Sequence, residues 1–252
     1  MTTPRHSSRP HRHSREGGNP LHWIEHPSAD AMAHALANTL HDACARAIAE
    51  RGQAWLALAG GKTPFPAYRE FARTNLPWPQ VQVVPTDERC VPNDHPASNH
   101  RAMLTAFLGA PGIVLHPLAE AGDDCNASLD QAHKRLARHP ESFDAVLLGM
   151  GADAHFASLF PGAPGLAAAL DPAGTPDVVR IDPEPLPPEA PFPRISLTLS
   201  RLLHAREIHL VVTGAGKRAV LEEAAASGDP LRHPVAALLH ANTAPLSLHW
   251  AA

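Results

Sequence analysis

The chain has 252 residues, of which 44% are hydrophobic and 18% are charged, and its formal net charge is −4. This composition allows a sizeable core in one large α/β domain or two small ones, and it excludes the strong basic excess of a nucleic-acid-binding surface. No apolar run approaches the ~20 residues that cross a bilayer, so we expect neither a nucleic-acid nor a membrane partner.

The three cysteines, Cys44, Cys90 and Cys125, are scattered and form no Cys-x-x-Cys pair. We therefore expect neither a disulfide framework nor a thiolate zinc site, and a reduced, cytoplasmic setting. The 18 histidines are spread along the chain without ligand spacing to carboxylates, so no metal is expected.

The first 20 residues are rich in His, Arg and Ser and lack the apolar segment of a secretory signal. We expect residues 1–20 to form a disordered tail and residues 21–252 to form a single domain. Apolar residues then recur every three to four positions over residues 31–51, between a Ser28 N-cap and Gly52, which predicts an amphipathic helix.

A buried strand is predicted over residues 54–59, and a glycine turn joins it to a helix that begins near Pro64 and ends near residue 73. Backbone N–H groups at such a helix start favour a phosphate, and Lys62 with the Thr63 hydroxyl would add to this preference. A tight turn without any ligand explains the same residues equally well.

The next strand is predicted over residues 81–85, and charged residues 87–89 follow its end. A lone charge cluster of this kind is more often a solvated loop. Ser98 predicts the start of a helix that reaches residue 108, and a short strand over 113–118 and a helix over 123–139 come next.

Residues 146–148 form an apolar run that predicts a buried parallel strand, and a glycine-rich turn follows it. Asp153 and His155 lie directly after this strand, where open α/β sheets bind their ligands. A carboxylate can orient an imidazole and raise its basicity, so the pair is a candidate acid/base site. The alternative is a pair of loop residues tied to nearby backbone. Residues 157–160 resemble one helical turn.

Residues 161–193 are rich in Pro and Gly, and little regular structure is expected there beyond residues 178–181. Strands are predicted over residues 194–199, 207–213 and 246–250, and helices over 214–226 and 231–240. Lys217 stands at the start of the first of these helices, as a phosphate ligand or as an ordinary solvated residue.

Strands and helices thus alternate, which predicts a three-layer α/β sandwich with a mostly parallel, open Rossmann-like sheet. Because the carboxyl ends of parallel strands meet at one edge of a sheet, the glycine turns and their charged residues predict one site that combines anion binding with acid/base chemistry.

The motifs come in an order that resembles the 6-phosphogluconolactonases, over about residues 22–250. They are Gly60-Gly61-Lys62-Thr63-Pro64; Asp87-Glu88-Arg89-Cys90-Val91-Pro92 with Asp94-His95 and Ser98-Asn99; Leu148-Gly149-Met150-Gly151-Ala152-Asp153-Ala154-His155 with Ala157-Ser158-Leu159-Phe160-Pro161; Arg194-Ile195-Ser196-Leu197-Thr198; and Thr213-Gly214 with Lys217.

The resemblance implies a hydrolase without a cofactor in the oxidative pentose phosphate pathway. Its partner would be a small sugar-phosphate lactone, 6-phospho-D-glucono-1,5-lactone, with 6-phosphogluconate as the product, and the chain would act as a monomer or weak homodimer. The wider superfamily includes glucosamine-6-phosphate deaminase and shares the Rossmann-like sheet.

Roles follow from the resemblance as expectations. His155 would be the general base, Asp153 would hold its imidazole, and Arg89 would stabilise the oxyanion or bind phosphate. The substrate-binding set would be Gly60, Gly61, Lys62, Thr63, Asp87, Arg194 and Lys217.

The chain departs from the family pattern beside the candidate base. Ala154 stands where relatives carry glycine, which costs free energy if the position needs a positive φ. Phe156 stands where a small hydroxyl residue is usual, which removes a possible hydrogen bond.

Two other functions remain alternatives. Aminosugar-phosphate deamination is disfavoured because residues 158–161 read Ser-Leu-Phe-Pro rather than Asn-Glu-Pro, and because Arg89 replaces a tyrosine. A sugar-phosphate-binding protein without catalysis is supported by Ala154 and Phe156 alone.

Overall fold

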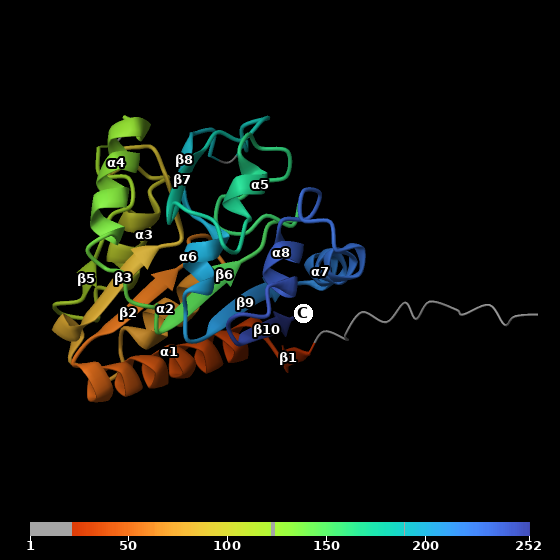
Figure 1. Ribbon diagram of the computed structural model, residues 1–252. Helices are drawn as coiled ribbons and strands as arrows, with labels where there is room; N and C mark the ends of the chain where they lie inside the picture. The colour runs from red at the N-terminus through yellow and green to blue at the C-terminus, as the bar shows by residue number, and fades with distance from the viewer. Residues whose placement is uncertain (1–21, 122–123, 189) are drawn as a thin grey trace, which may run out of the picture.

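Seven parallel strands form the central sheet of the computed structural model, which describes residues 22–121, 124–188 and 190–252 (Figure 1). Their order across the sheet is β1-β10-β9-β6-β2-β3-β5. The strands are β1 (Trp23–His26), β2 (Ala54–Leu58), β3 (Val81–Pro85), β5 (Val114–Leu115), β6 (Ala145–Gly149), β9 (Ile208–Thr213) and β10 (Leu246–Ala251). The mostly parallel α/β sheet is confirmed, and the expected tail over residues 1–20 lies outside the described residues.

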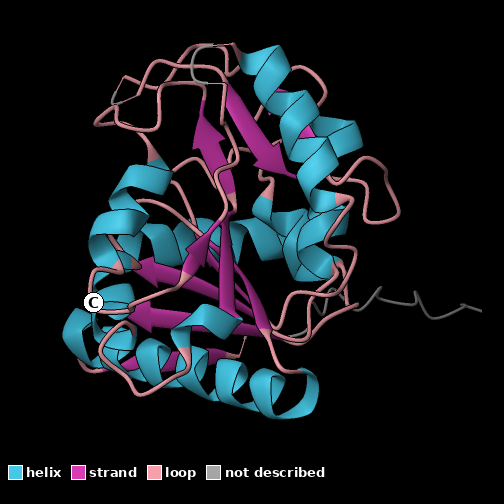
Figure 2. Cartoon of the chain, turned by 90° about the vertical axis from the view of Figure 1, so that its left-hand side faces the viewer, coloured by secondary structure: helices cyan, strands magenta, loops and turns pink. Residues whose placement is uncertain are grey.

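Helices cover both faces of this sheet and make a sandwich of three layers (Figures 1 and 2). One face packs against α1 (Ala29–Arg51), α2 (Phe65–Phe71) and α3 (Asn99–Ala106). The other packs against α4 (Cys125–Leu136), α5 (Leu166–Ala169), α6 (Leu199–Leu203), α7 (Ala215–Ser227) and α8 (Val235–His240). A short 3₁₀ helix, Trp78–Gln80, precedes β3.

Strand β6 shows why the central strands read as continuous apolar runs. Ala145 and Leu147 belong to the core on the α1 side, whereas Val146 and Leu148 belong to the core on the opposite side. Alternate side chains of a strand point to opposite faces, so a strand covered on both faces needs apolar residues throughout.

The caps of α1 are those that the sequence predicts. The Ser28 hydroxyl accepts a hydrogen bond from the Ala31 N–H at 3.1 Å, and Gly52 ends the helix with a φ of 79°. Side-chain oxygens satisfy free N–H groups at a helix start, and glycine adopts the left-handed backbone of a helix end without a Cβ clash.

A second, antiparallel sheet stands beside the carboxyl ends of the central strands, with the order β4-β8-β7. It consists of β4 (Asp87–Arg89), β8 (Arg194–Leu197) and β7 (Val178–Ile181). The interpretation of residues 87–89 as a solvated loop was therefore wrong. Asp87 and Glu88 belong to a strand paired with β8, and both are buried.

Several local expectations need correction. Residues 157–160 form no helical turn; the Leu159 N–H instead donates to the Phe156 carbonyl at 3.0 Å in a tight turn. The strand expected over residues 194–199 ends at Leu197, because Thr198 caps α6. Strand β1 was not predicted, and α5 lies within the stretch expected to be irregular.

The expectation of unpaired cysteines was also wrong. Cys90 and Cys125 form a disulfide with 5.2 Å between their Cα atoms, whereas Cys44 is a buried free thiol. The bond joins the residue after β4 to the first residue of α4. These elements are distant in sequence, so the spacing of the cysteines gave no indication that they meet.

Within the described ranges, no helix combines the length and apolar character needed to cross a membrane.

Candidate active site

A cavity of about 270 Å³ opens at the carboxyl ends of the central strands, and we refer to it as the pocket. It lies where loops after β2, β3, β6 and β9 meet the second sheet. Nine of the ten predicted site residues line it, namely Gly60, Gly61, Lys62, Thr63, Asp87, Arg89, His155, Arg194 and Lys217. The tenth, Asp153, contacts His155 from the side.

Asp153 and His155 form a close pair in the loop after β6. The Nδ1 atom of His155 lies 2.5 Å from Oδ1 of Asp153, so the hydrogen is assigned to Nδ1 and Nε2 carries the free lone pair. Burial pushes the pKa of Asp153 upward, but the hydrogen bond and charge of His155 outweigh it and leave that pKa below its ordinary value. The arrangement orients the imidazole for proton transfer at Nε2.

Gly151 leaves the space in which this pair packs. A Cβ built on Gly151 would lie 2.2 Å from Nδ1 of His155 and 2.5 Å from Oδ1 of Asp153. The Gly151 N–H also donates to the His155 carbonyl at 2.9 Å. Glycine is needed here because the backbone and the imidazole approach more closely than a methyl group allows.

The backbone of this loop has a positive φ at Ala154, the position where the sequence departs from the glycine of the family pattern. That residue has a φ of 66°, and Ala157 has a φ of 47°. An L-residue in this region places its Cβ close to a carbonyl oxygen, so both alanines carry backbone strain. Phe156, the other departure, is fully buried on the side away from the pocket.

Arg89 and Arg194 face each other across the pairing of β4 with β8. Arg89 donates to the Ala97 carbonyl at 2.6 Å, and Arg194, which is 2% exposed, donates to the Ala190 carbonyl at 2.8 Å. Burial and the charge of Arg89 lower the pKa of Arg194 to about 10. Nε of Arg89 and Nε and Nη1 of Arg194 have no hydrogen-bond partner in the described part of the chain.

Asp87 connects the two sides of the pocket. Its carboxylate accepts from the Ser158 hydroxyl at 2.5 Å, and its carbonyl accepts from Nδ2 of Asn99 at 2.8 Å. The side-chain amide of Asn99 also packs against the turn after β2, since a Cβ on Gly60 would lie 2.1 Å from Oδ1 of Asn99. These contacts fix Asp87 while its side chain still lines the pocket.

Glu88 points away from the pocket and holds the start of α3. It accepts hydrogen bonds from the Ser98 hydroxyl and from the backbone N–H groups of Arg89, Asn99 and His100. Burial raises its pKa despite these donors. Glu88 therefore fixes the backbone on which Arg89 and Asn99 stand.

Lys217 and the turn at Gly60 lie on opposite sides of His155 in the sheet order, because β6 lies between β9 and β2. The Nζ of Lys217 donates to the Met150 carbonyl at 2.7 Å and keeps further donors for a ligand. Lys62 is exposed at the rim, and the start of α2 has no side-chain cap, with Pro64 one position earlier than expected.

The pocket lining without a predicted role includes Asn99, Ser158 and Phe160. The ring of Phe160 lies 4.2 Å from the imidazole of His155, centroid to centroid, and the guanidinium carbon of Arg194 lies 5.9 Å from the Phe160 ring. All three residues stand in the motifs quoted above, but their contacts depend on segments that the fold brings together.

The pocket is lined by four cations, Lys62, Arg89, Arg194 and Lys217, and by the carboxylate of Asp87, while the carboxylate of Asp153 contacts His155. Local charge therefore favours an anion although the whole chain is acidic. The described ranges contain no group of three or more His, Cys, Asp or Glu residues that could hold a metal ion. The geometry suits proton transfer to and from a bound organic anion.

Known proteins resemble the chain over most of its length. The family described as glucosamine-6-phosphate isomerases/6-phosphogluconolactonase matches residues 27–250. A 6-phosphogluconolactonase of Rhizobium meliloti is 40% identical over 233 residues, 92% of this chain and 98% of the relative.

Solved structures show the same fold. A 6-phosphogluconolactonase from Shewanella baltica superimposes with a TM-score of 0.86 at 30% identity, over 93% of this chain and 99% of the other. A monomeric glucosamine-6-phosphate deaminase has a TM-score of 0.74 at 20% identity, over 92% and 97% of the two chains, and this likeness concerns the fold alone.

Proposed function

The chain belongs to the glucosamine-6-phosphate isomerase/6-phosphogluconolactonase family, and we propose that its pocket hydrolyses 6-phospho-D-glucono-1,5-lactone to 6-phosphogluconate. The activity is that of a carboxylic ester hydrolase in the oxidative pentose phosphate pathway. One observation carries the proposal for this chain: His155, which is paired with Asp153, lines the same pocket as four cations.

We propose that His155 acts as the general base. Its Nε2 takes a proton from water while the water oxygen bonds to C1 of the lactone, which gives a tetrahedral intermediate. The intermediate collapses with cleavage of the bond between C1 and the ring oxygen, and the imidazolium returns its proton to that oxygen. Asp153 holds the ring and stabilises its charged form, and the 2.5 Å contact between the two side chains supports this role.

The cations suit the two negative groups that the reaction presents. We assign the 6-phosphate to the backbone of residues 60–63, with Lys217 and Arg194 as counter-charges. We assign the oxyanion that develops at C1 to Arg89, whose Nε has no partner in the described residues. Asp87 would accept a hydrogen bond from a sugar hydroxyl.

A coupled assay tests the proposal. Glucose 6-phosphate is oxidised to the lactone, and hydrolysis is followed with and without the protein against the spontaneous reaction. We expect His155→Ala to lower kcat by ~10²–10⁴, the usual contribution of acid/base catalysis. His34→Ala is the control, because His34 is 72% exposed on α1 and pairs with Glu70 outside the pocket.

Two results would overturn this assignment. Near-wild-type hydrolysis by His155→Ala would remove His155 from the mechanism. Ammonia release from glucosamine 6-phosphate, without lactone hydrolysis above background, would assign the chain to the deaminase branch of the family.

We further propose that residues 21–252 act as one domain, as a monomer or weak homodimer in the cytoplasm. A phosphate dianion crosses a bilayer poorly because its charge is costly to desolvate, so the enzyme has to share the compartment in which its substrate is made. Sedimentation of the purified protein at micromolar concentration measures the oligomeric state.

A further inference from the structure

The loop that carries the candidate base has a backbone shape that its own residues disfavour. Ala154 and Ala157, on either side of His155, have φ values of 66° and 47°. Each disfavours the observed conformation by roughly five- to thirtyfold relative to ordinary backbone. Contacts outside the loop therefore have to hold it in place.

Side chains alternate along this loop between the pocket and the core. Ala154 and Phe156 are fully buried outside the pocket, whereas His155 and Ala157 line it. Neighbouring side chains thus point to opposite sides of one short segment. A movement that turns Phe156 out of the core would turn His155 away from the pocket.

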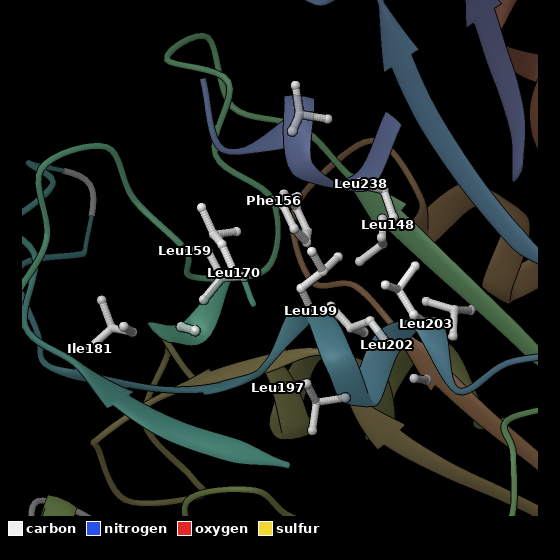
Figure 3. Close-up of a cluster of buried hydrophobic side chains, with 14 of the residues drawn as sticks. Leu148, Phe156, Leu159, Leu170, Ile181, Leu197, Leu199, Leu202, Leu203 and Leu238 are labelled. Carbon is white, nitrogen blue, oxygen red and sulfur yellow. The ribbon is translucent and has the colours of Figure 1, made fainter. Parts of the chain in front are cut away.

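Phe156 is the large apolar side chain within residues 151–158, and it is fully buried. Figure 3 shows it in the middle of a cluster that includes Leu148 of β6, Leu199 of α6 and Leu238 of α8. Its burial therefore anchors the loop in the core to which β6, α6 and α8 contribute. Burial of a phenylalanine is among the largest apolar contributions that a single residue makes.

A backbone hydrogen bond acts at the same place. The Val235 N–H at the start of α8 donates to the Ala154 carbonyl at 3.0 Å. This bond fixes the peptide group between Ala154 and His155. It holds one side of the loop, and Phe156 holds the centre.

We propose that Phe156 is a positioning residue for lactone hydrolysis: its burial offsets the strain at Ala154 and Ala157 and so keeps the imidazole of His155 against Asp153 and over the pocket. The inference rests on the proposed function, because its readout is the hydrolysis step. A smaller side chain would let the loop relax toward ordinary backbone and carry the imidazole with it.

The experiment compares two phenylalanines of the same core. Phe143 is also fully buried, but it precedes β6 at the end far from the pocket. Phe156→Leu and Phe143→Leu are each made alone and together with Ala154→Gly, which relieves the strain at the left-handed position. The kcat, KM and melting temperature of each variant are measured by the coupled assay and by thermal unfolding.

We expect Phe156→Leu to lower kcat by about tenfold, the order of the strain at one left-handed residue, with KM within about twofold of wild type. Adding Ala154→Gly should restore kcat to within about threefold, although Ala154→Gly alone leaves it nearly unchanged. Phe143→Leu should lower the melting temperature but keep kcat, and Ala154→Gly should not change kcat in that background.

Equal losses of kcat in the two leucine variants would overturn the inference, as would a loss in Phe156→Leu that Ala154→Gly leaves unchanged. If Phe156→Leu does not fold, Phe156→Met replaces it under the same criteria, because methionine keeps most of the volume. A wild-type protein without lactonase activity would instead refute the proposed function.

Discussion

Both ends of the central sheet carry clusters of charged side chains, but the charges are used differently. At the carboxyl ends of the strands, Arg89 and Arg194 keep guanidinium nitrogens without partners among the described residues. At the opposite end, a cavity of about 240 Å³ is lined by three arginines, each paired with a carboxylate. The pairs are Arg46 with Glu207, Arg51 with Glu50 and Asp144, and Arg206 with Asp144.

The difference shows which end is built to receive a ligand. A buried polar group without a partner costs free energy, and a bound anion at Arg89 and Arg194 would recover it. Paired charges offer no such gain, because a ligand would have to break an existing contact. We therefore expect changes at the pocket end to alter catalysis and changes at the paired end to alter stability.

Among the variants that test this difference between the two ends, we expect the largest effect from one added methyl group at the pocket end. Gly151→Ala would place a Cβ 2.2 Å from the His155 ring and displace it. A misplacement of about 1 Å can cost roughly 10²-fold in rate, so we expect kcat to fall by about that factor. Steady-state kinetics in the coupled lactonase assay would measure it.

Gly216→Ala is the control, since a Cβ on Gly216 would meet nothing within 4 Å and Gly216 does not line the pocket. It should keep at least half of the wild-type kcat. Wild-type turnover by Gly151→Ala would contradict the placement of the imidazole described above.

Much of the fold is readable from local sequence because its signals are local. The apolar periodicity and caps of α1, and the apolar run of β6, need no knowledge of the rest of the chain. Strand β4 could not be found in this way. Its three residues are Asp, Glu and Arg, and their burial depends on pairing with β8, far along the chain.

The site likewise contains features that local sequence predicts and features that depend on packing between distant segments. Glycine turns at strand ends predict which loops meet, and the structure brings Gly60, His155 and Lys217 to one pocket. The contact of Phe160 with His155 and the bond from Ser158 to Asp87 depend on side-chain packing that no spacing encodes. The catalytic roles themselves stay predictions until the variants are measured.

At the paired end, Asp144 should be the most sensitive position. Its carboxylate accepts from the Trp55 N–H at 2.9 Å and contacts Arg51 and Arg206, and burial still raises its pKa above the ordinary value. Asp144→Ala leaves these donors unpaired, so we expect the free energy of unfolding to fall by ~2–4 kcal/mol with KM unchanged. Urea denaturation measures the loss.

Glu50→Ala tests whether the loss of stability in Asp144→Ala comes from the burial of the carboxylate rather than from its charge alone. Glu50 also contacts Arg51, but its side chain is 61% exposed. Exposed ion pairs contribute little, so the loss should stay below ~1 kcal/mol. A change in KM with Asp144→Ala would contradict the separation between the two ends.

The smallest expected effect concerns a histidine chain that runs from the paired end across β9, β10 and β1. Nδ1 of His209 lies 3.1 Å from Nε2 of His249, and Nδ1 of His249 lies 3.1 Å from Nε2 of His26. With hydrogen on each Nε2, both contacts have one donor and one acceptor, and Nε2 of His209 faces Glu207 at 3.5 Å. The chain is therefore arranged for neutral rings.

Burial, reinforced by the neighbouring His209 and His26, lowers the pKa of His249 to about 3 from an ordinary value of 6.5. His249 thus takes up a proton at a lower pH in the folded protein than in the unfolded chain. The contribution of the neutral His249 ring to the stability of the fold is complete above pH 6.5 and is lost as the pH falls toward 3. We expect the free energy of unfolding to drop by roughly 2 kcal/mol between pH 7 and pH 5 from this ring.

The variant His249→Leu isolates that contribution. His116, whose pKa burial lowers to about 4, is present in both the wild type and the variant and therefore changes the stability of both in the same direction. Leucine removes one ionisable group and leaves two imidazoles without their partner, so the variant should be less stable at pH 7. The informative quantity is the slope, since the variant should lose less stability than wild type between pH 7 and pH 5. Equal slopes in urea denaturation would show that His249 takes up no extra proton on unfolding, and the neutral chain would have to be abandoned.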